Sequence, residues 1–134
     1  MSWTIELPAG GMFGWPPSPN DRTGWRVRAR QTAGWRAAVY GAVHLAEIPH
    51  QSRIEASVTW RTTRGRPNDH DNLVARCKPL YDGLVGCWFG SGAARVLLPG
   101  IIDDDDAAHL VHGPVLEERI PGSAGAIILT ISAA

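Results

Sequence analysis

The chain has 134 residues with 13 basic and 13 acidic side chains, so its formal net charge is zero. A length of this order suits one domain with its own hydrophobic core, and we expect a single domain over residues 1–134. No apolar run approaches the ~20 residues that a membrane-spanning helix needs. Residues Met1–Glu6 also lack the pattern of a secretory signal. We therefore expect a cytoplasmic protein without a membrane partner.

The two signs of charge are separated along the sequence. Through Arg66 there are nine arginines and four acids, which gives 9 − 4 = +5. From Pro67 onward there are four basic and nine acidic residues, which gives 4 − 9 = −5. Twelve of the 13 basic residues are arginine, whose planar guanidinium suits bidentate contacts with phosphate. Solvated arginines from GC-rich codons would explain the arginine bias alone, but the separation of signs favours an acidic site carried on an arginine-rich, DNA-facing domain.

The N-terminal part predicts a strand, an irregular loop and a basic segment. Trp3–Leu7 alternates apolar and polar residues, which is typical of a strand. Pro8–Asn20 has three glycines and four prolines, so it is either a stiff surface loop or a loop close to a substrate backbone. Arg22–Arg30 interleaves arginines with Trp25. That pattern suits nucleic acid through phosphate pairing and stacking, and a solvated arm is the alternative.

The next segment predicts one helix and one strand. Thr32 is a candidate N-cap for a helix that runs to about Glu47 with an apolar stripe at helical spacing. Arg53–Arg61 alternates apolar and polar side chains and is the clearest strand of the sequence. Thr62–Asn68 follows as a polar turn. The two cysteines of the chain are too few for a disulfide framework, so we expect free thiols.

The C-terminal half predicts a broken helix and further strands. After Asp71 an apolar face recurs at helical spacing, and Pro79 predicts a kink or a new helix beginning there. Gly86–Pro99 is broken by glycines and has a strand-like run near its end. Leu110–Ile120 predicts a strand interrupted by a Gly-Pro pair, and Ala126–Ile131 predicts a buried strand. Strands alternating with two helices indicate a two-layer α/β (α+β) fold.

Two acidic clusters are candidate metal ligands. Asp69 and Asp71 are one residue apart, and in an extended or turn segment such side chains point the same way. Together they could hold Mg²⁺, or alternatively Mn²⁺, through oxygen, and a third carboxylate from Asp103–Asp106 would complete the ligand set. Lys78 is the only lysine. It would place a point charge on a scissile phosphate or on developing negative charge.

Ordinary structural roles account for the same residues. Pairs of aspartates one residue apart are common in turns, and Asp71 could cap a helix. Four aspartates in a row usually form a solvated loop, and Lys78 could be an ordinary surface lysine. The spacing alone leaves both interpretations open.

Three motifs and a Pro-rich opening follow one another in a specific order. They are Trp15-Pro16-Pro17-Ser18 with Asn20, Asp69-His70-Asp71-Asn72-Leu73, Lys78-x-x-x-Asp82-x-Leu84, and Gly100-Ile101-Ile102-Asp103-Asp104-Asp105. This ordered set resembles the RusA family of Holliday-junction resolvases over nearly the whole chain. The family shows L-P-W-P-P-S-x-N, then D-x-D-N-L, then K-x-x-x-D-x-L, then a glycine followed by three residues and D-D.

The resemblance implies a fold, an activity and a set of site residues. The fold would be RusA-like, a small mixed β-sheet with two main helices packed on one face. The family's catalytic, metal-binding aspartates correspond to Asp69, Asp71 and Asp105, with Asp104 as the alternative third ligand, and its functional lysine corresponds to Lys78. The protein would be a homodimer that cuts four-way DNA junctions symmetrically with Mg²⁺ or Mn²⁺. Members are often encoded by phages or prophages.

The residues that we expect to contact nucleic acid are mostly basic. They are Arg22, Arg26, Arg28, Arg64, Arg66, Asn72 and Lys78.

Two departures from the family pattern bear on the function. Three extra residues within Val74–Cys77 precede Lys78 and could change its reach. A longer insertion at Cys87–Pro99 could reposition Asp105, lengthen the DNA-facing rim or alter the dimer. From the motifs and the resemblance together we expect a Mg²⁺-dependent, structure-selective endodeoxyribonuclease that resolves Holliday junctions in DNA recombination and repair. The alternatives are a junction-binding protein without cleavage activity and a small structural domain that binds a divalent ion.

Overall fold

The structure is a computed structural model that describes residues 1–8, 15–18, 24–63 and 69–134. Its elements in chain order are β1 (Ser2–Pro8), α1 (Trp25–Leu45), β2 (Ile54–Thr62), α2 (His70–Ala75), α3 (Lys78–Val85), β3 (Gly86–Phe89), η1 (Gly92–Ala94), β4 (Val96–Pro99), β5 (Leu110–Arg119) and β6 (Ala126–Ala133). The predicted nucleic-acid contacts of Arg22, Arg64 and Arg66, and motif residue Asn20, lie outside the described residues and stay predictions.

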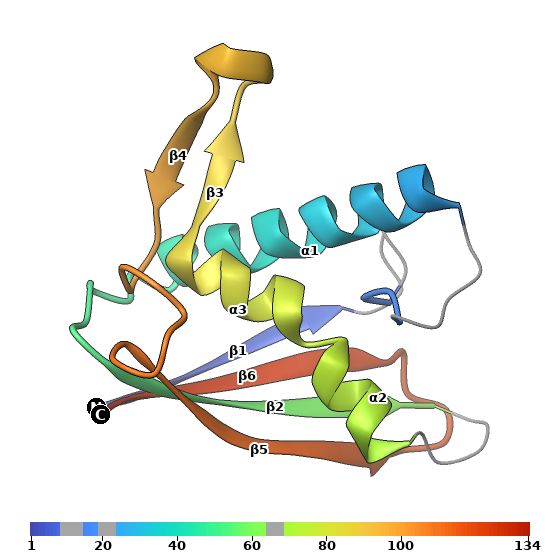
Figure 1. The fold of residues 1–134 in the computed structure, drawn as a ribbon. Helices are drawn as coiled ribbons and strands as arrows, with labels where there is room; N and C mark the ends of the chain where they lie inside the picture. The colour runs from blue at the N-terminus through green and yellow to red at the C-terminus, as the bar shows by residue number, and fades with distance from the viewer. Residues whose placement is uncertain (9–14, 19–23, 64–68) are drawn as a thin grey trace.

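Four strands form one mixed sheet in the order β1-β6-β2-β5. Strand β6 pairs antiparallel with β1 and with β2, whereas β2 and β5 are parallel. Parallel neighbours need a crossover connection. Here the crossover contains α2, α3, the β3–β4 hairpin and the aspartate-rich loop, residues 100–109 between β4 and β5. The helices lie over one face of the sheet (Figure 1). The predicted two-layer fold, with a small mixed sheet and helices on one face, is confirmed.

The core lies between the sheet and the helices. Alternate residues of β2 from Ile54 to Trp60 are buried, as the sequence pattern predicts. They belong to one cluster of buried side chains that also includes Val39 of α1 and Leu84 of α3. The two helices approach each other closely at Gly83, where an added Cβ would lie 2.7 Å from Val39 Cβ. Burial of these apolar side chains is the main source of stability.

Helix α1 begins earlier than predicted. Its N-cap is Gly24, which has no side chain that could cap the helix, and Thr32 lies inside the helix. The prediction of Thr32 as the N-cap is therefore wrong. Buried Trp35 and Val39 anchor the helix from its middle, and packing of an apolar face stabilises a helix more than a cap does. As a result Arg26–Arg30 lies on the first turns of α1 rather than in an arm.

The break that Pro79 predicts is present. Helices α2 and α3 are separated at residues 76–77, and Pro79 lies in the first turn of α3. The predicted interruption at Gly113-Pro114 is present as a register shift in the pairing with β2, although β5 itself continues through both residues. These two residues lie opposite Ser57 alone, where the register with β2 shifts. A bulge of this kind accommodates a proline that cannot donate to the ladder.

A second, two-stranded sheet is formed by β3 and β4, which pair antiparallel. This hairpin projects away from the two-layer body (Figure 1). The sequence predicts its second strand only, because the apolar residues of Gly86–Phe89 do not alternate with polar ones. The two cysteines are free thiols, as expected. None of the helices in the described part of the chain is long and apolar enough to span a bilayer.

Candidate active site

Lys78 connects two segments that are far apart in the sequence. It is the first residue of α3, and one turn later Asp82 lies beside it. The Lys78 ammonium Nζ lies 2.9 Å from Asp82 Oδ1 and also binds Asp105 Oδ2. Lys78 is 63% exposed, whereas the two aspartates are 26% and 28% exposed. We call Lys78, Asp82 and Asp105 the lysine cluster.

Backbone contacts with α3 hold the aspartate-rich loop in place. The N–H of Gly100 donates to Val85 O at 2.7 Å, and the N–H of Ile101 donates to Leu84 O at 2.8 Å. A Cβ at Gly100 would lie 2.2 Å from Leu84 O, so only glycine fits here. Ile101 and Ile102 are buried. They anchor the loop, and the aspartates that follow lie beside α3.

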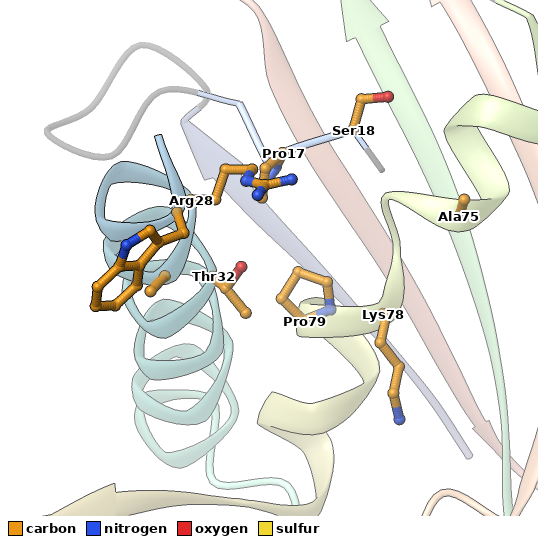
Figure 2. A pocket seen from close by; sticks show the side chains of 9 residues that line it. Pro17, Ser18, Arg28, Thr32, Ala75, Lys78 and Pro79 are labelled. Atoms are coloured by element: carbon orange, nitrogen blue, oxygen red, sulfur yellow. The ribbon is translucent and has the colours of Figure 1, made fainter. Parts of the chain in front are cut away.

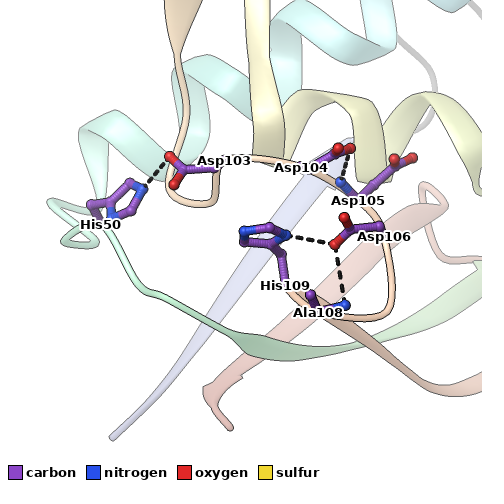
Figure 3. Close-up of polar contacts among 7 residues, drawn as sticks. All are labelled: His50, Asp103, Asp104, Asp105, Asp106, Ala108 and His109. Carbon is purple, nitrogen blue, oxygen red and sulfur yellow. Dashed lines mark hydrogen bonds and ion pairs between the residues drawn. The ribbon is translucent and has the colours of Figure 1, made fainter.

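The four consecutive aspartates have four different environments (Figure 3). Asp103 lies 2.9 Å from His50 Nε2, and Asp104 Oδ1 accepts the backbone N–H of Asp105 at 2.7 Å. Asp106 lies 2.5 Å from His109 Nδ1 and also accepts the backbone N–H of Ala108. Asp105 is the member that contacts Lys78. Residues Asp103–Asp106 therefore do not act as one equivalent group.

The ion pairs shift the titration of their members. The pKa of Lys78 is raised, chiefly by the hydrogen bond to Asp105 and then by that to Asp82. The Lys78 ammonium in turn lowers the pKa of Asp105. In the neighbouring pair, Asp106 raises the pKa of His109, and His109 lowers the pKa of Asp106. The raised pKa of Lys78 and the lowered pKa of Asp105 both favour the charged forms of this pair at neutral pH.

Asp69 and Asp71 lie at the start of α2, and both are exposed. Asp69 is the N-cap residue with extended backbone and no side-chain capping bond, and Asp71 lies in the first helical turn. The expectation that both belong to an extended or turn segment is therefore wrong for Asp71. Between them, His70 Nε2 lies 3.1 Å from Val115 O of β5. This contact and buried Leu73 fix α2 on the sheet.

The Pro-rich opening motif packs on α2. Ser18 Oγ donates to Asn72 Oδ1 at 2.6 Å, and Arg76 Nε donates to Pro16 O at 2.7 Å. Trp15 stacks on Trp60 of β2 with ring centroids 5.5 Å apart. Two segments of the resemblance, more than 50 residues apart, are thus joined side by side, and Asn72 of the predicted nucleic-acid set lies at their junction.

A groove of about 400 Å³ runs beside these segments. It is lined by the opening motif, by Arg28 and Thr32 of α1 and by Lys78 at the start of α3 (Figure 2). The stem of Lys78 lines the groove, while its ammonium points away from Arg28 and binds Asp82 and Asp105. Two positive side chains of the predicted nucleic-acid set therefore border one groove. Arg26 lies nearby on α1, with its guanidinium 5.3 Å from the ring centre of Trp25.

The acidic side chains are of the donor type that binds a hard divalent cation, but the described residues do not gather them into one ligand set. Asp82 and Asp105 both present carboxylate oxygens to the Nζ atom of Lys78. Carboxylate oxygens are also the ligands that Mg²⁺ prefers. Within the described residues, no group of three or more His, Cys, Asp or Glu side chains is arranged to hold a metal ion. The structure thus brings together Lys78 and Asp105 of the predicted site. Among the described residues, no hydrogen bond or ion pair joins Asp69 or Asp71 to the lysine cluster.

Asp82 is the member of the cluster that the predicted site residues omit. Its signal is present in the sequence, because Asp82 lies four residues after Lys78 and side chains at this spacing meet on a helix. The predicted kink or helix start at Pro79 leaves the position of Lys78 open, and the structure places Lys78 at the start of α3. That placement makes Asp82 a partner of the ammonium.

A scan of protein-family models finds no match to this chain, and a search of curated proteins finds none either.

Proposed function

We propose that the protein is a Mg²⁺-dependent endodeoxyribonuclease of the RusA type that resolves four-way DNA junctions. The observation that carries the proposal is the ion pair between Lys78 and Asp105. The resemblance assigns both residues to one site, although 27 positions separate them in the sequence. The contact of Ser18 with Asn72 supports the same assignment, because it joins the opening motif to the D-x-D-N-L motif.

Each residue has a distinct role in this proposal. Asp69, Asp71 and Asp105 would hold the ion, with Asp104 beside them, and Mn²⁺ would serve in place of Mg²⁺. When bound, the ion would polarise a phosphoryl oxygen and lower the pKa of a water molecule. The Lys78 ammonium stabilises negative charge that develops on the phosphate. Arg26 and Arg28 on α1 bind the DNA backbone outside the reacting centre.

A homodimer would place two such sites on opposed strands of a two-fold symmetric junction. The setting would be DNA recombination and repair in the cytoplasm of a bacterium or of a phage-infected host. Arg22, Arg64 and Arg66 would extend the contact with the DNA backbone.

Cleavage of a synthetic four-way junction tests the proposal. The four strands are labelled one at a time at the 5′ end and incubated with the protein and Mg²⁺. The proposal predicts paired nicks at symmetric positions in opposed strands, and no nicks with EDTA. Binding without cutting in Mg²⁺ or Mn²⁺ would instead show a junction-binding protein without nuclease activity. Absence of binding at low salt would contradict both functions.

A further inference from the structure

The β3–β4 hairpin exposes large apolar side chains. Trp88 is 45% exposed, Phe89 is 70% exposed and Val96 is 56% exposed. The guanidinium of Arg95 lies 4.2 Å from the ring centre of Trp88. Phe89 and Val96 are opposite each other in the hairpin and share one face, whereas Trp88 lies on the other face. A two-stranded hairpin is marginally stable by itself, and exposed apolar side chains on a projecting element are typical of an interaction site.

The base of the hairpin is fixed to α1. Arg36 Nε donates to Gly86 O at 2.7 Å. A groove of about 430 Å³ lies between the two elements, and Arg30, Arg36 and Trp88 are among the residues that line it. The hairpin is thus a projecting element with an anchored base, and Trp88 borders the same groove as Arg30 and Arg36 of α1.

The charge of this surface identifies the partner. Neither α1 nor residues 83–102 contain an aspartate or a glutamate, whereas together they contain five arginines. Among the described residues, ion pairs to a carboxylate are absent at Arg26, Arg30 and Arg95. Arginine beside exposed aromatic rings suits a polyanion with stackable bases. A two-fold contact between copies would instead bring the same arginines together, and like charges oppose such a contact.

We propose that the β3–β4 hairpin is a base-stacking arm that binds unpaired or unstacked nucleotides at the branch point of DNA. Trp88 and Phe89 stack on exposed bases, and Arg95 and Arg30 pair with the adjoining phosphates. The inference rests on the proposed function, because a DNA junction is the ligand that presents such bases to this protein. A continuous duplex keeps its bases stacked, so the arm distinguishes branched from linear DNA.

The test measures binding of full-length protein to a synthetic four-way junction and to a linear duplex, without divalent ions. The variants are Trp88→Ala and Phe89→Ala. The control is Leu45→Ala, which removes an 88% exposed side chain at the C-terminal end of α1, outside the residues that line the groove. Each aromatic variant is expected to raise the junction Kd by about tenfold or more, while the duplex Kd and the solution mass stay unchanged. 2-Aminopurine at the branch point should lose its quenching by the protein in both variants.

Three results would overturn the inference. Equal junction Kd values for wild type and both aromatic variants would exclude stacking by the hairpin, and leave junction cleavage by the wild type untouched. Equal weakening on junction and duplex would exclude a branch-specific role. A halved solution mass in the variants would show that the arm contacts a second copy of the chain. If the wild type itself bound neither DNA at low salt, the proposed function would fail together with the arm.

Discussion

The ion pairs of Lys78 with Asp82 and Asp105 contribute little to the stability of the fold. Lys78 is mostly exposed, and ion pairs near the surface are worth about 1 kcal/mol or less because water and salt screen them. A position of this kind tolerates substitution, so loss of Lys78 should report on chemistry rather than on folding.

The coupling between Lys78 and Asp105 predicts a measurable titration. The pKa of Asp105 is lowered by Lys78, so this pair stabilises the folded protein above the ordinary carboxyl pKa and the effect is lost as the pH falls through the folded value. The pKa of Lys78 is raised, so its contribution is lost only when the pH rises through a value above the ordinary lysine pKa. In Lys78→Gln, NMR titration should show a higher pKa for Asp105. An unchanged pKa would contradict the ion pair.

Asp71 gives a second prediction for a single residue. Asp71→Asn should reduce junction cleavage by about 100-fold or more, because it removes a carboxylate ligand of the proposed ion. Junction binding should stay equal or become tighter, since one negative charge facing DNA is lost. Single-turnover cleavage and a binding titration measure the two effects. The matched control is Asp103→Asn, whose carboxylate pairs with His50. Equal loss of cleavage in both variants would remove the special role of Asp71.

At the scale of elements, the contact between the aspartate-rich loop and α3 determines where Asp105 lies. Gly100→Ala would bring a Cβ to within 2.2 Å of Leu84 O, and the loop would have to move. We expect unfolding to be easier by about 1–3 kcal/mol, measured by denaturant titration, and cleavage to fall with it. Gly41→Ala is the control, because a Cβ there meets nothing within 4 Å. It should be neutral or stabilising, since alanine favours a helix interior. Equal stability of the two variants would contradict the close contact.

The elements with a strong local pattern are the ones that sequence reasoning finds. Alternation in β2, the apolar run of β6 and the break at Pro79 each act within a few residues. The predicted start of α1 is wrong because the helix begins at Trp25, where no side-chain cap marks its start in the sequence. Only the second strand of the hairpin is predicted, because Trp88 and Phe89 in the first strand follow neither the alternation of a strand nor the spacing of a helix. The contact of Lys78 with Asp105 depends on the whole crossover, so the spacing of the residues leaves it open and the resemblance specifies the two residues.

At the scale of the molecule, the arginines of α1 and the acidic site lie on different elements. In the proposed function, this separation would let the DNA backbone bind at one surface while the acidic side chains meet a single phosphate. Binding should therefore weaken steeply as salt is added, because phosphate contacts release counterions.

Arg28 gives the corresponding prediction. Arg28→Ala should weaken junction and duplex binding alike and lower the slope of log K against log salt by about one. Arg53→Ala is the control, because Arg53 precedes β2 and its carbonyl accepts the backbone N–H of the C-terminal residue, Ala134. The slopes come from binding titrations at several salt concentrations. A slope that changes as much in Arg53→Ala as in Arg28→Ala would contradict a DNA surface on α1.

The central claim is that Lys78 and Asp105 act together in phosphodiester cleavage. A double-mutant cycle of single-turnover junction cleavage with Lys78→Gln and Asp105→Asn tests it most directly. We predict that each single variant cuts at least about 100-fold more slowly than wild type, and that the double variant is little slower than either. Cleavage by both single variants at nearly the wild-type rate would contradict the claim.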